Sequence, residues 1–130
     1  RLKIIDYSCF LINKLLFLED KNSEILNSYQ DLLISMNNNS NYLVDLIKLE
    51  LEILKSSGYQ PDLSDSVIKK ILGDGLLINA NSYDELSILL KNDQDSQEAF
   101  SNFMEKVIVK VLNNLNINLP FKRSEIIQKN

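Results

Sequence analysis

One stretch of the chain, residues 42–63 with the sequence YLVDLIKLELEILKSSGYQPDL, constrains the fold more than any other. Apolar residues cover most of the circumference that a helix through it would have. The charged residues recur at steps of three and four and form one polar stripe: Asp45, Lys48, Glu52 and Lys55. A helix that is apolar on most of its surface packs against neighbours on several sides. We therefore expect a helix from about residue 41 at the centre of the domain.

A glycine and a proline predict where this helix ends. Gly58 lacks a Cβ and can adopt the left-handed conformation that closes many helices. Pro61 cannot continue a helix, so the chain has to turn there. We expect Gly58, Tyr59, Pro61 and Asp62 to form this corner.

Helical periodicity also marks the two flanks of the segment that holds the three glycines, Gly58, Gly73 and Gly75, and neither flank contains a glycine. Two apolar stripes precede the centre, Leu2, Ile5, Cys9, Ile12 and Leu16, then Ile25, Tyr29, Leu32, Leu33 and Met36. The longest stripe follows it: Phe100, Phe103, Met104, Val107, Ile108, Val111, Leu112 and Leu115. Spacings of three and four are typical of amphipathic helices. These spacings place Cys9 on an apolar helix face. We therefore expect Cys9 to be a small buried hydrophobic residue rather than a nucleophile.

Local signals predict where the later helices begin. Ser82 with Glu85 matches the capping box that opens a helix. Asp95 with Glu98 matches the same box, with Asp in place of Ser or Thr. Pro120 suits the first turn of a last short helix, where its missing N–H is not needed.

The overall pattern predicts an all-α fold. Residues 58–82 are expected to be irregular, with a helical turn near 66–72 and a brief extended piece at LLIN. No sustained alternation of apolar and polar residues indicates a sheet. We therefore expect residues 1–130 to form one domain, a compact bundle of five to seven helices.

Most residue types of enzyme chemistry are missing. The chain has no His and one Cys, which removes imidazole bases, His ligands, multi-cysteine zinc sites and intrachain disulfides. The GDG at 73–75 lacks the further residues of a calcium or phosphate loop and is interpreted as a tight turn. The nearby carboxylates are interpreted as solvated rather than metal-binding: Asp62, Asp65, Asp74 and Asp84. We expect neither catalysis nor a cofactor.

Charge and hydropathy argue against two further classes of partner, nucleic acids and membranes, although a local basic patch remains open. The formal net charge is -4, whereas binding to the phosphate backbone of a nucleic acid relies on clustered Lys and Arg. This domain alone is therefore a poor candidate for binding DNA. No apolar stretch reaches the roughly 20 residues that span a bilayer, so we expect a protein that does not enter membranes. The single cysteine, Cys9, fits a reducing compartment, and we expect a cytoplasmic protein.

Glu50 is the unusual residue of the central helix, because it lies opposite the polar stripe. A buried carboxylate is costly unless it is paired. Two interpretations remain open. Either the helix is rotated so that Glu50 reaches solvent, or Glu50 forms a structural ion pair with a cation of the C-terminal segment, Arg123 or Lys122.

The letters LELEILKSSGYQPDLS at 49–64 resemble the C-terminal helical domain of the DNA repair protein RecO family. The matching positions are Glu50, Leu51, Leu54, Gly58, Tyr59, Pro61, Asp62 and Leu63. The helix pair before this motif and the segment LPFKRSEII, with Leu119, Pro120 and Arg123, are also similar to the family. Many members hold zinc after this turn, but Ser66 and Lys69 stand where cysteines would be, so no zinc is expected.

The resemblance implies a non-catalytic domain of a recombination mediator, which loads RecA on single-stranded DNA coated by single-stranded DNA-binding protein (SSB). It implies a groove for the acidic and hydrophobic C-terminal tail of SSB, with Lys106, Lys110, Lys122 and Arg123 as candidate cations. Contacts with RecR and DNA rest in the family on an N-terminal oligonucleotide-binding barrel, which is expected to be absent from this chain. The alternative is a helical scaffold or adaptor unrelated to DNA repair.

Overall fold

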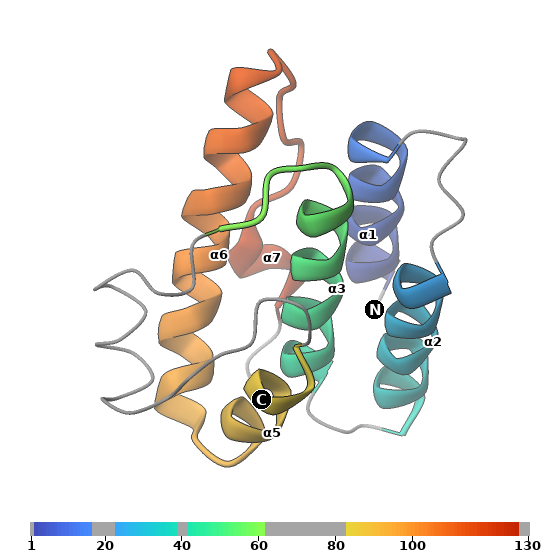
Figure 1. Ribbon diagram of the computed structural model, residues 1–130, viewed down its shortest axis with the longest axis vertical. Helices are drawn as coiled ribbons and strands as arrows, with labels where there is room; N and C mark the ends of the chain where they lie inside the picture. Colours follow the sequence, from blue (N-terminus) through green and yellow to red (C-terminus); the bar gives the residue numbers. More distant parts are fainter. Residues whose placement is uncertain (1, 17–22, 39–41, 62–82, 128–130) are drawn as a thin grey trace.

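The computed structural model describes residues 2–16, 23–38, 42–61 and 83–127. These residues form six helices and no strand, which confirms the predicted all-α fold (Figure 1). The helices are α1 (Leu2–Leu15), α2 (Ser23–Asn37), α3 (Tyr42–Ser56), α5 (Asp84–Lys91), α6 (Gln94–Asn114) and α7 (Arg123–Ile126). The predicted turn near 66–72, the LLIN piece, GDG, and Asp62, Asp65 and Asp74 lie outside the described residues.

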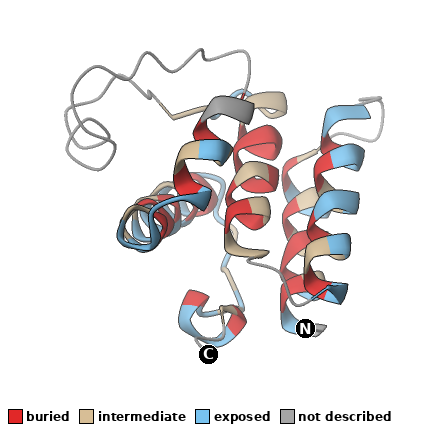
Figure 2. Cartoon of the chain, turned by 90° about the horizontal axis from the view of Figure 1, so that it is seen from below, coloured by how far each residue is buried: buried red, intermediate tan, exposed pale blue. Residues whose placement is uncertain are grey.

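Helix α3 lies at the centre of the fold, as its sequence predicted. It packs against α1 and α2 on one side and against α6 and α5 on the other (Figure 1). Nine of its fifteen residues are buried, and they lie all round the helix (Figure 2). Each neighbour therefore covers part of α3, and the core is built around this helix.

The prediction of which face of α1 is buried is wrong. The buried face is rotated about the helix axis by about one residue from the predicted face. The buried residues of α1 are Ile4, Tyr7, Ser8, Leu11 and Leu15, whereas Ile5, Ile12 and Leu16 are partly exposed. Cys9 is exposed, so it is not the buried hydrophobe that we expected. Helix α1 has apolar residues on two adjacent faces, and the face with Tyr7 turns inward because that hydroxyl binds a carboxylate of α3.

The predicted polar stripe of α3 is also partly wrong. Asp45, Lys48 and Lys55 are partly exposed, but Glu52 is only 5% exposed. Helix α2 packs closely along this side of α3. A position that would be exposed to solvent on an isolated helix is thus covered by a neighbouring helix.

Two predicted helix starts differ from the structure. Asp93, not Asp95, caps α6, because its Oδ1 accepts hydrogen bonds from the N–H groups of Asp95 and Ser96 at 3.1 and 3.4 Å. Asp93 has an extended backbone while Asp95 is already helical. Helix α5 begins at Asp84 after Tyr83, which makes no side-chain cap hydrogen bond, and Ser82 lies outside the described residues.

The segment after α6 is extended, so Pro120 does not stand in the first turn of a helix as predicted. Alternate residues face the core: Ile117, Leu119, Phe121 and Arg123 are partly or fully buried, while Asn118, Pro120 and Lys122 are exposed. The Phe121 ring contacts the rings of Tyr7 and Phe10 edge-on at centroid distances of 6.0 and 5.9 Å. This strap, residues 117–122, ties the C-terminal end of the chain to α1 before α7 begins.

None of the helices in the described part of the chain combines the length and hydropathy that crossing a lipid bilayer requires.

Candidate functional site

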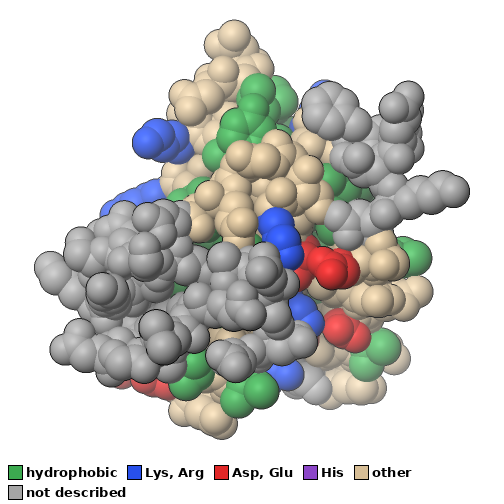
Figure 3. All heavy atoms as spheres, in the orientation of Figure 1, with side chains coloured by type: hydrophobic (Ala, Val, Ile, Leu, Met, Phe, Trp, Pro, Cys, Tyr) green, Lys and Arg blue, Asp and Glu red, His purple; other side chains and the backbone are tan. Residues whose placement is uncertain are grey.

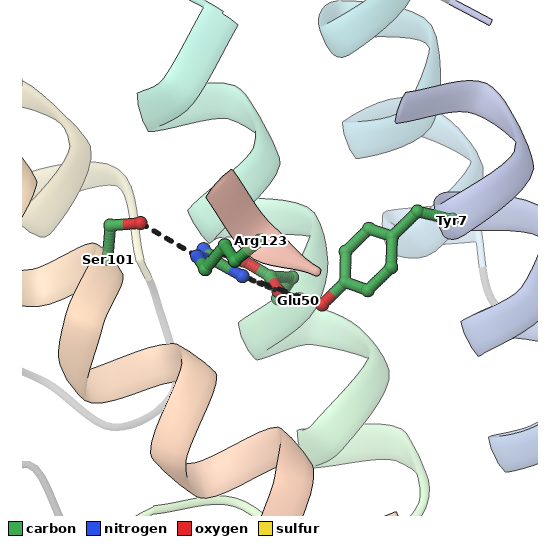
Figure 4. Close-up of polar contacts among 4 residues, drawn as sticks. All are labelled: Tyr7, Glu50, Ser101 and Arg123. Atoms are coloured by element: carbon green, nitrogen blue, oxygen red, sulfur yellow. Dashed lines mark hydrogen bonds and ion pairs between the residues drawn. The ribbon is translucent and has the colours of Figure 1, made fainter. Parts of the chain in front are cut away.

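A buried polar network lies where α1, α3, α6 and α7 meet (Figure 4). Its centre is Glu50, which is 1% exposed although it carries a carboxylate. The interpretation in which α3 rotates to bring Glu50 to solvent is therefore wrong. Glu50 lies on a covered face of α3, so its carboxylate depends on protein groups to replace water.

Arg123, the first residue of α7, supplies the cation. Its Nη1 and Nη2 each donate a hydrogen bond of 2.7 Å to the two carboxylate oxygens of Glu50, a bidentate ion pair. The structure thus brings Glu50 and Arg123 together as the sequence suggested. The other candidate, Lys122, is exposed at the N-cap of α7. A guanidinium fits this role because its planar fork matches a carboxylate.

Two neutral side chains complete the network. The Tyr7 hydroxyl of α1 donates to Glu50 Oε2 at 2.5 Å, and the Arg123 Nε–H donates to Ser101 Oγ of α6 at 2.7 Å. Burial and then the Glu50 charge raise the pKa of Tyr7 well above its ordinary value. Burial works to lower the pKa of Arg123, but the Glu50 carboxylate more than offsets it, so this pKa lies above its usual range. Tyr7 therefore stays a neutral hydrogen-bond donor, and Arg123 stays a cation.

This network is suited to holding helices together rather than to a reaction. Both oxygens of Glu50 and all three guanidinium nitrogens of Arg123 are engaged with protein groups. Because Arg123 is only 7% exposed, it is not available to an outside ligand. The prediction that Arg123 also binds a partner is therefore wrong.

Sequence reasoning missed Tyr7 and Ser101. Tyr7 belongs to the second apolar stripe of α1, three residues from Ile4 and four from Leu11, and this spacing could have revealed it. Ser101 carries no such signal, because a serine beside Phe100 on an amphipathic helix is equally compatible with the solvent face.

The corner after α3 has the geometry that Gly58 predicted. Gly58 has a φ of 84°. The N–H of Tyr59 bonds to the carbonyl of Leu54 at 2.8 Å and that of Gly58 to the carbonyl of Lys55 at 3.3 Å. These two bonds make a Schellman motif, the common left-handed helix end. Tyr59 is 37% exposed and Pro61 is partly exposed, while Asp62 lies outside the described residues.

The exposed side of α6 carries the remaining candidate cations. Lys106 and Lys110 are exposed one turn apart, and Val109 between them is 36% exposed. They line a shallow, open hollow of about 480 Å³, together with Glu105, Asn113 and Asn114. Figure 3 shows basic side chains at the upper left, over α6, next to hydrophobic ones. Lys122 is not among the described residues that line this hollow.

The described residues include no group of three or more His, Cys, Asp or Glu side chains that could hold a metal ion. Ser66 and Lys69, which stand at the family's zinc positions, lie outside the described part of the chain. The expectation that zinc is absent therefore stays a prediction.

The chain matches a family model described as Recombination protein O C terminal over residues 1–102. Neither a curated protein nor a solved structure matches it. The matched region includes Glu50 and the Gly58 corner, and it ends before Lys106 and Arg123. Because the match extends over most of the chain and the fold is all-α, the chain belongs to the recombination protein O family, in its C-terminal domain.

Proposed function

We propose that this chain is the helical domain of a recombination mediator, and that it supports the loading of RecA on SSB-coated single-stranded DNA by binding other proteins. The observation that carries the proposal is the family match over residues 1–102. The described residues offer a surface for such contacts, the exposed side of α6.

The chemistry of that surface suits an acidic and hydrophobic peptide. Lys106 and Lys110 provide two ammonium groups for carboxylates, and Val109 provides apolar surface between them. Both lysines stand on a helix of 21 residues that is anchored to the core by Phe100, Met104 and Ile108. A rigid helix presenting cations and an apolar side chain needs little reorganisation to bind, which lowers the entropic cost.

Binding at this surface should be modest and sensitive to salt. Exposed ion pairs contribute less than about 1 kcal/mol each, and salt screens them over a distance of roughly 10 Å at 0.1 M. We therefore propose that the SSB tail binds the α6 surface through its carboxylates and its apolar end. In the family, contacts with RecR and DNA reside in the barrel domain, and we assign neither to the surface of α6.

The test is a titration of a fluorescent SSB-tail peptide with the chain, followed by anisotropy at low and high salt. Lys106→Ala/Lys110→Ala should weaken binding about tenfold, which corresponds to roughly 1.4 kcal/mol. The matched control is Lys3→Ala/Lys14→Ala, which removes the same charge from exposed positions of α1. Equal affinities of the two double variants would refute the α6 surface. Absence of salt-sensitive binding at hundreds of micromolar peptide would refute the SSB contact altogether.

A further inference from the structure

Glu105 is the one carboxylate among the described residues that line the hollow on α6, beside the two lysines that are proposed to bind the acidic peptide. It is exposed and directly precedes Lys106 in the chain. Its negative charge therefore works against the ligand that the lysines attract. A charge that weakens the desired contact can still improve selectivity, because it weakens contacts with other ligands more.

Helical geometry separates the opposite charges on the exposed side of α6. At roughly 100° per residue, Lys106 and Lys110 lie about 100° and 140° round the helix from Glu105. Val109 lies between them, about 40° from Glu105. Glu98, two turns before Glu105 and also exposed, lies within about 20° of it. The exposed side of α6 thus has a basic edge, an acidic edge and apolar surface between the two.

The acidic edge lies next to the buried network. Ser101, one turn before Glu105, is buried and accepts the hydrogen bond of 2.7 Å from Arg123 Nε. Residues four apart share a face of a helix, so Glu105 stands on the side of α6 that points to α7. Burial works to lower the pKa of Arg123, Glu50 works to raise it, and Glu105 adds a smaller effect in the same direction as Glu50. The contacts that fix α6 in the core therefore also fix the place of the acidic edge.

A peptide and a nucleic acid meet these two edges differently. A short peptide can place all of its carboxylates beside Lys106 and Lys110 and rest an apolar side chain on Val109. A nucleic acid carries a negative charge on every nucleotide, and its affinity grows with the number of phosphates that meet Lys or Arg. A helix with its side chains is about 10–12 Å wide, close to the roughly 10 Å over which charges act at 0.1 M salt. A strand that binds the two lysines therefore also brings phosphates within reach of Glu105.

We propose that Glu105 is a specificity-determining residue of the α6 surface, which admits an acidic and hydrophobic peptide and rejects single-stranded nucleic acid. The inference rests on the proposed function, since it takes the two lysines as the binding groups. It lets the domain contact a protein on DNA without losing its lysines to the DNA itself. The net charge of -4 acts in the same direction over the whole chain, whereas Glu105 acts at the place where the cations lie.

The test compares Glu105→Gln with the wild type by fluorescence anisotropy at low salt, with two labelled ligands, the SSB-tail peptide and an oligothymidylate. Glu105→Gln should bind the oligonucleotide about threefold more tightly, the scale of one exposed charge, and the peptide less than about twofold more tightly. The matched control is Asp31→Asn, which removes the same charge from an exposed position of α2 and should change neither affinity. Equal oligonucleotide affinities of Glu105→Gln and Asp31→Asn would overturn the inference.

Charge reversal gives a second readout. In Glu105→Lys a third cation joins the hollow, so the slope of log affinity for the oligonucleotide against log salt should steepen by about 0.7. Asp31→Lys makes the same change of net charge on α2 and should keep the slope of the wild type. An unchanged slope in Glu105→Lys, with its helix content verified by circular dichroism, would also overturn the inference. If Glu105→Lys does not fold, the comparison with Glu105→Gln decides.

The inference and the proposed function fail separately. A wild type that binds no peptide refutes the proposed function, whereas the oligonucleotide measurements still decide whether Glu105 repels nucleic acid. Peptide binding that depends on Lys106 and Lys110, together with an equal gain for both ligands in Glu105→Gln, would leave the proposed function standing and overturn the selectivity.

Discussion

Arg123 lies 73 residues after Glu50 in the chain, yet each of its two terminal nitrogens stands 2.7 Å from a different oxygen of the Glu50 carboxylate. The ion pair joins the last described helix to the central one, and Tyr7 and Ser101 extend it to α1 and α6. Four helices thus depend on one buried set of polar contacts. Removing Glu50 or Arg123 leaves the other charge buried without its ion-pair partner, which costs more than the pair itself contributes.

Glu50→Ala should lower the free energy of unfolding by about 3–5 kcal/mol, because it leaves the guanidinium of Arg123 buried and unpaired. Urea unfolding followed by circular dichroism measures this loss. Glu125→Ala, which removes an exposed carboxylate from α7, is the control and should change stability by less than about 0.5 kcal/mol. A loss below about 0.5 kcal/mol for Glu50→Ala would contradict the structural role of the pair.

Replacing both partners should be less damaging than replacing either one. In Glu50→Leu/Arg123→Met the two charges are exchanged together for apolar side chains of similar volume, so no buried charge remains. We expect the double variant to lose less stability than Glu50→Leu alone, measured by the same unfolding experiment. Losses that simply add would show that Glu50 and Arg123 do not interact energetically.

Tyr7→Phe should cost roughly 1.5 kcal/mol, at the lower end for hydrogen bonds to charged groups, because Arg123 still donates to the same oxygen of Glu50. The ring and its edge-on contact with Phe121 are kept. Tyr29→Phe is the matched control, since among the described residues the contact of the Tyr29 hydroxyl is a weak one, 3.9 Å from Cys9 Sγ. Comparable losses for the two variants in denaturant unfolding would argue against a specific bond from Tyr7 to Glu50.

The features predicted correctly are those that local chemistry determines. Gly58 closes α3 because the left-handed conformation is strained for residues with a Cβ, and this requirement is readable from the sequence. The central place of α3 follows from its apolar circumference. Helix α1 shows the limit of this reasoning. Its two apolar faces differ by one residue of rotation, and the choice between them depends on Glu50, which is 43 positions from Tyr7.

The strap and Glu52 were missed for a related reason. The large apolar residues Ile117, Leu119 and Phe121 do stand at alternate positions, but this run is too short to stand out beside the long periodic helices. Glu52 belongs to a polar stripe when α3 is considered alone, and only the packing of α2 buries it. Tertiary contacts, rather than intrinsic preference, decide both cases.

Gly58→Ala should destabilise the chain by about 1 kcal/mol, because φ is 84° at this position and an alanine there is strained. An added Cβ meets no atom within 4 Å, so the loss is conformational rather than steric. Gly58→Asn should retain more stability, since Asn tolerates the left-handed region and occupies it at Asn116, where α6 ends with the same motif. Thermal unfolding of the two variants separates these effects, and equal losses would contradict the conformational explanation.

Asp93→Ala should lower the midpoint of thermal unfolding more than Asp95→Ala does, because the carboxylate of Asp93 accepts the hydrogen bonds that begin α6. The hydrogen bonds from Ser96 lower the pKa of Asp93 below its ordinary value of 3.8. A depressed folded-state pKa contributes stability above the unfolded pKa, and this contribution is lost as pH falls through the folded value. The difference between wild type and Asp93→Ala should therefore be present at pH 6 and shrink below pH 4. An equal or larger effect of Asp95→Ala at pH 6 would place the start of α6 at the position that the sequence pattern alone suggested.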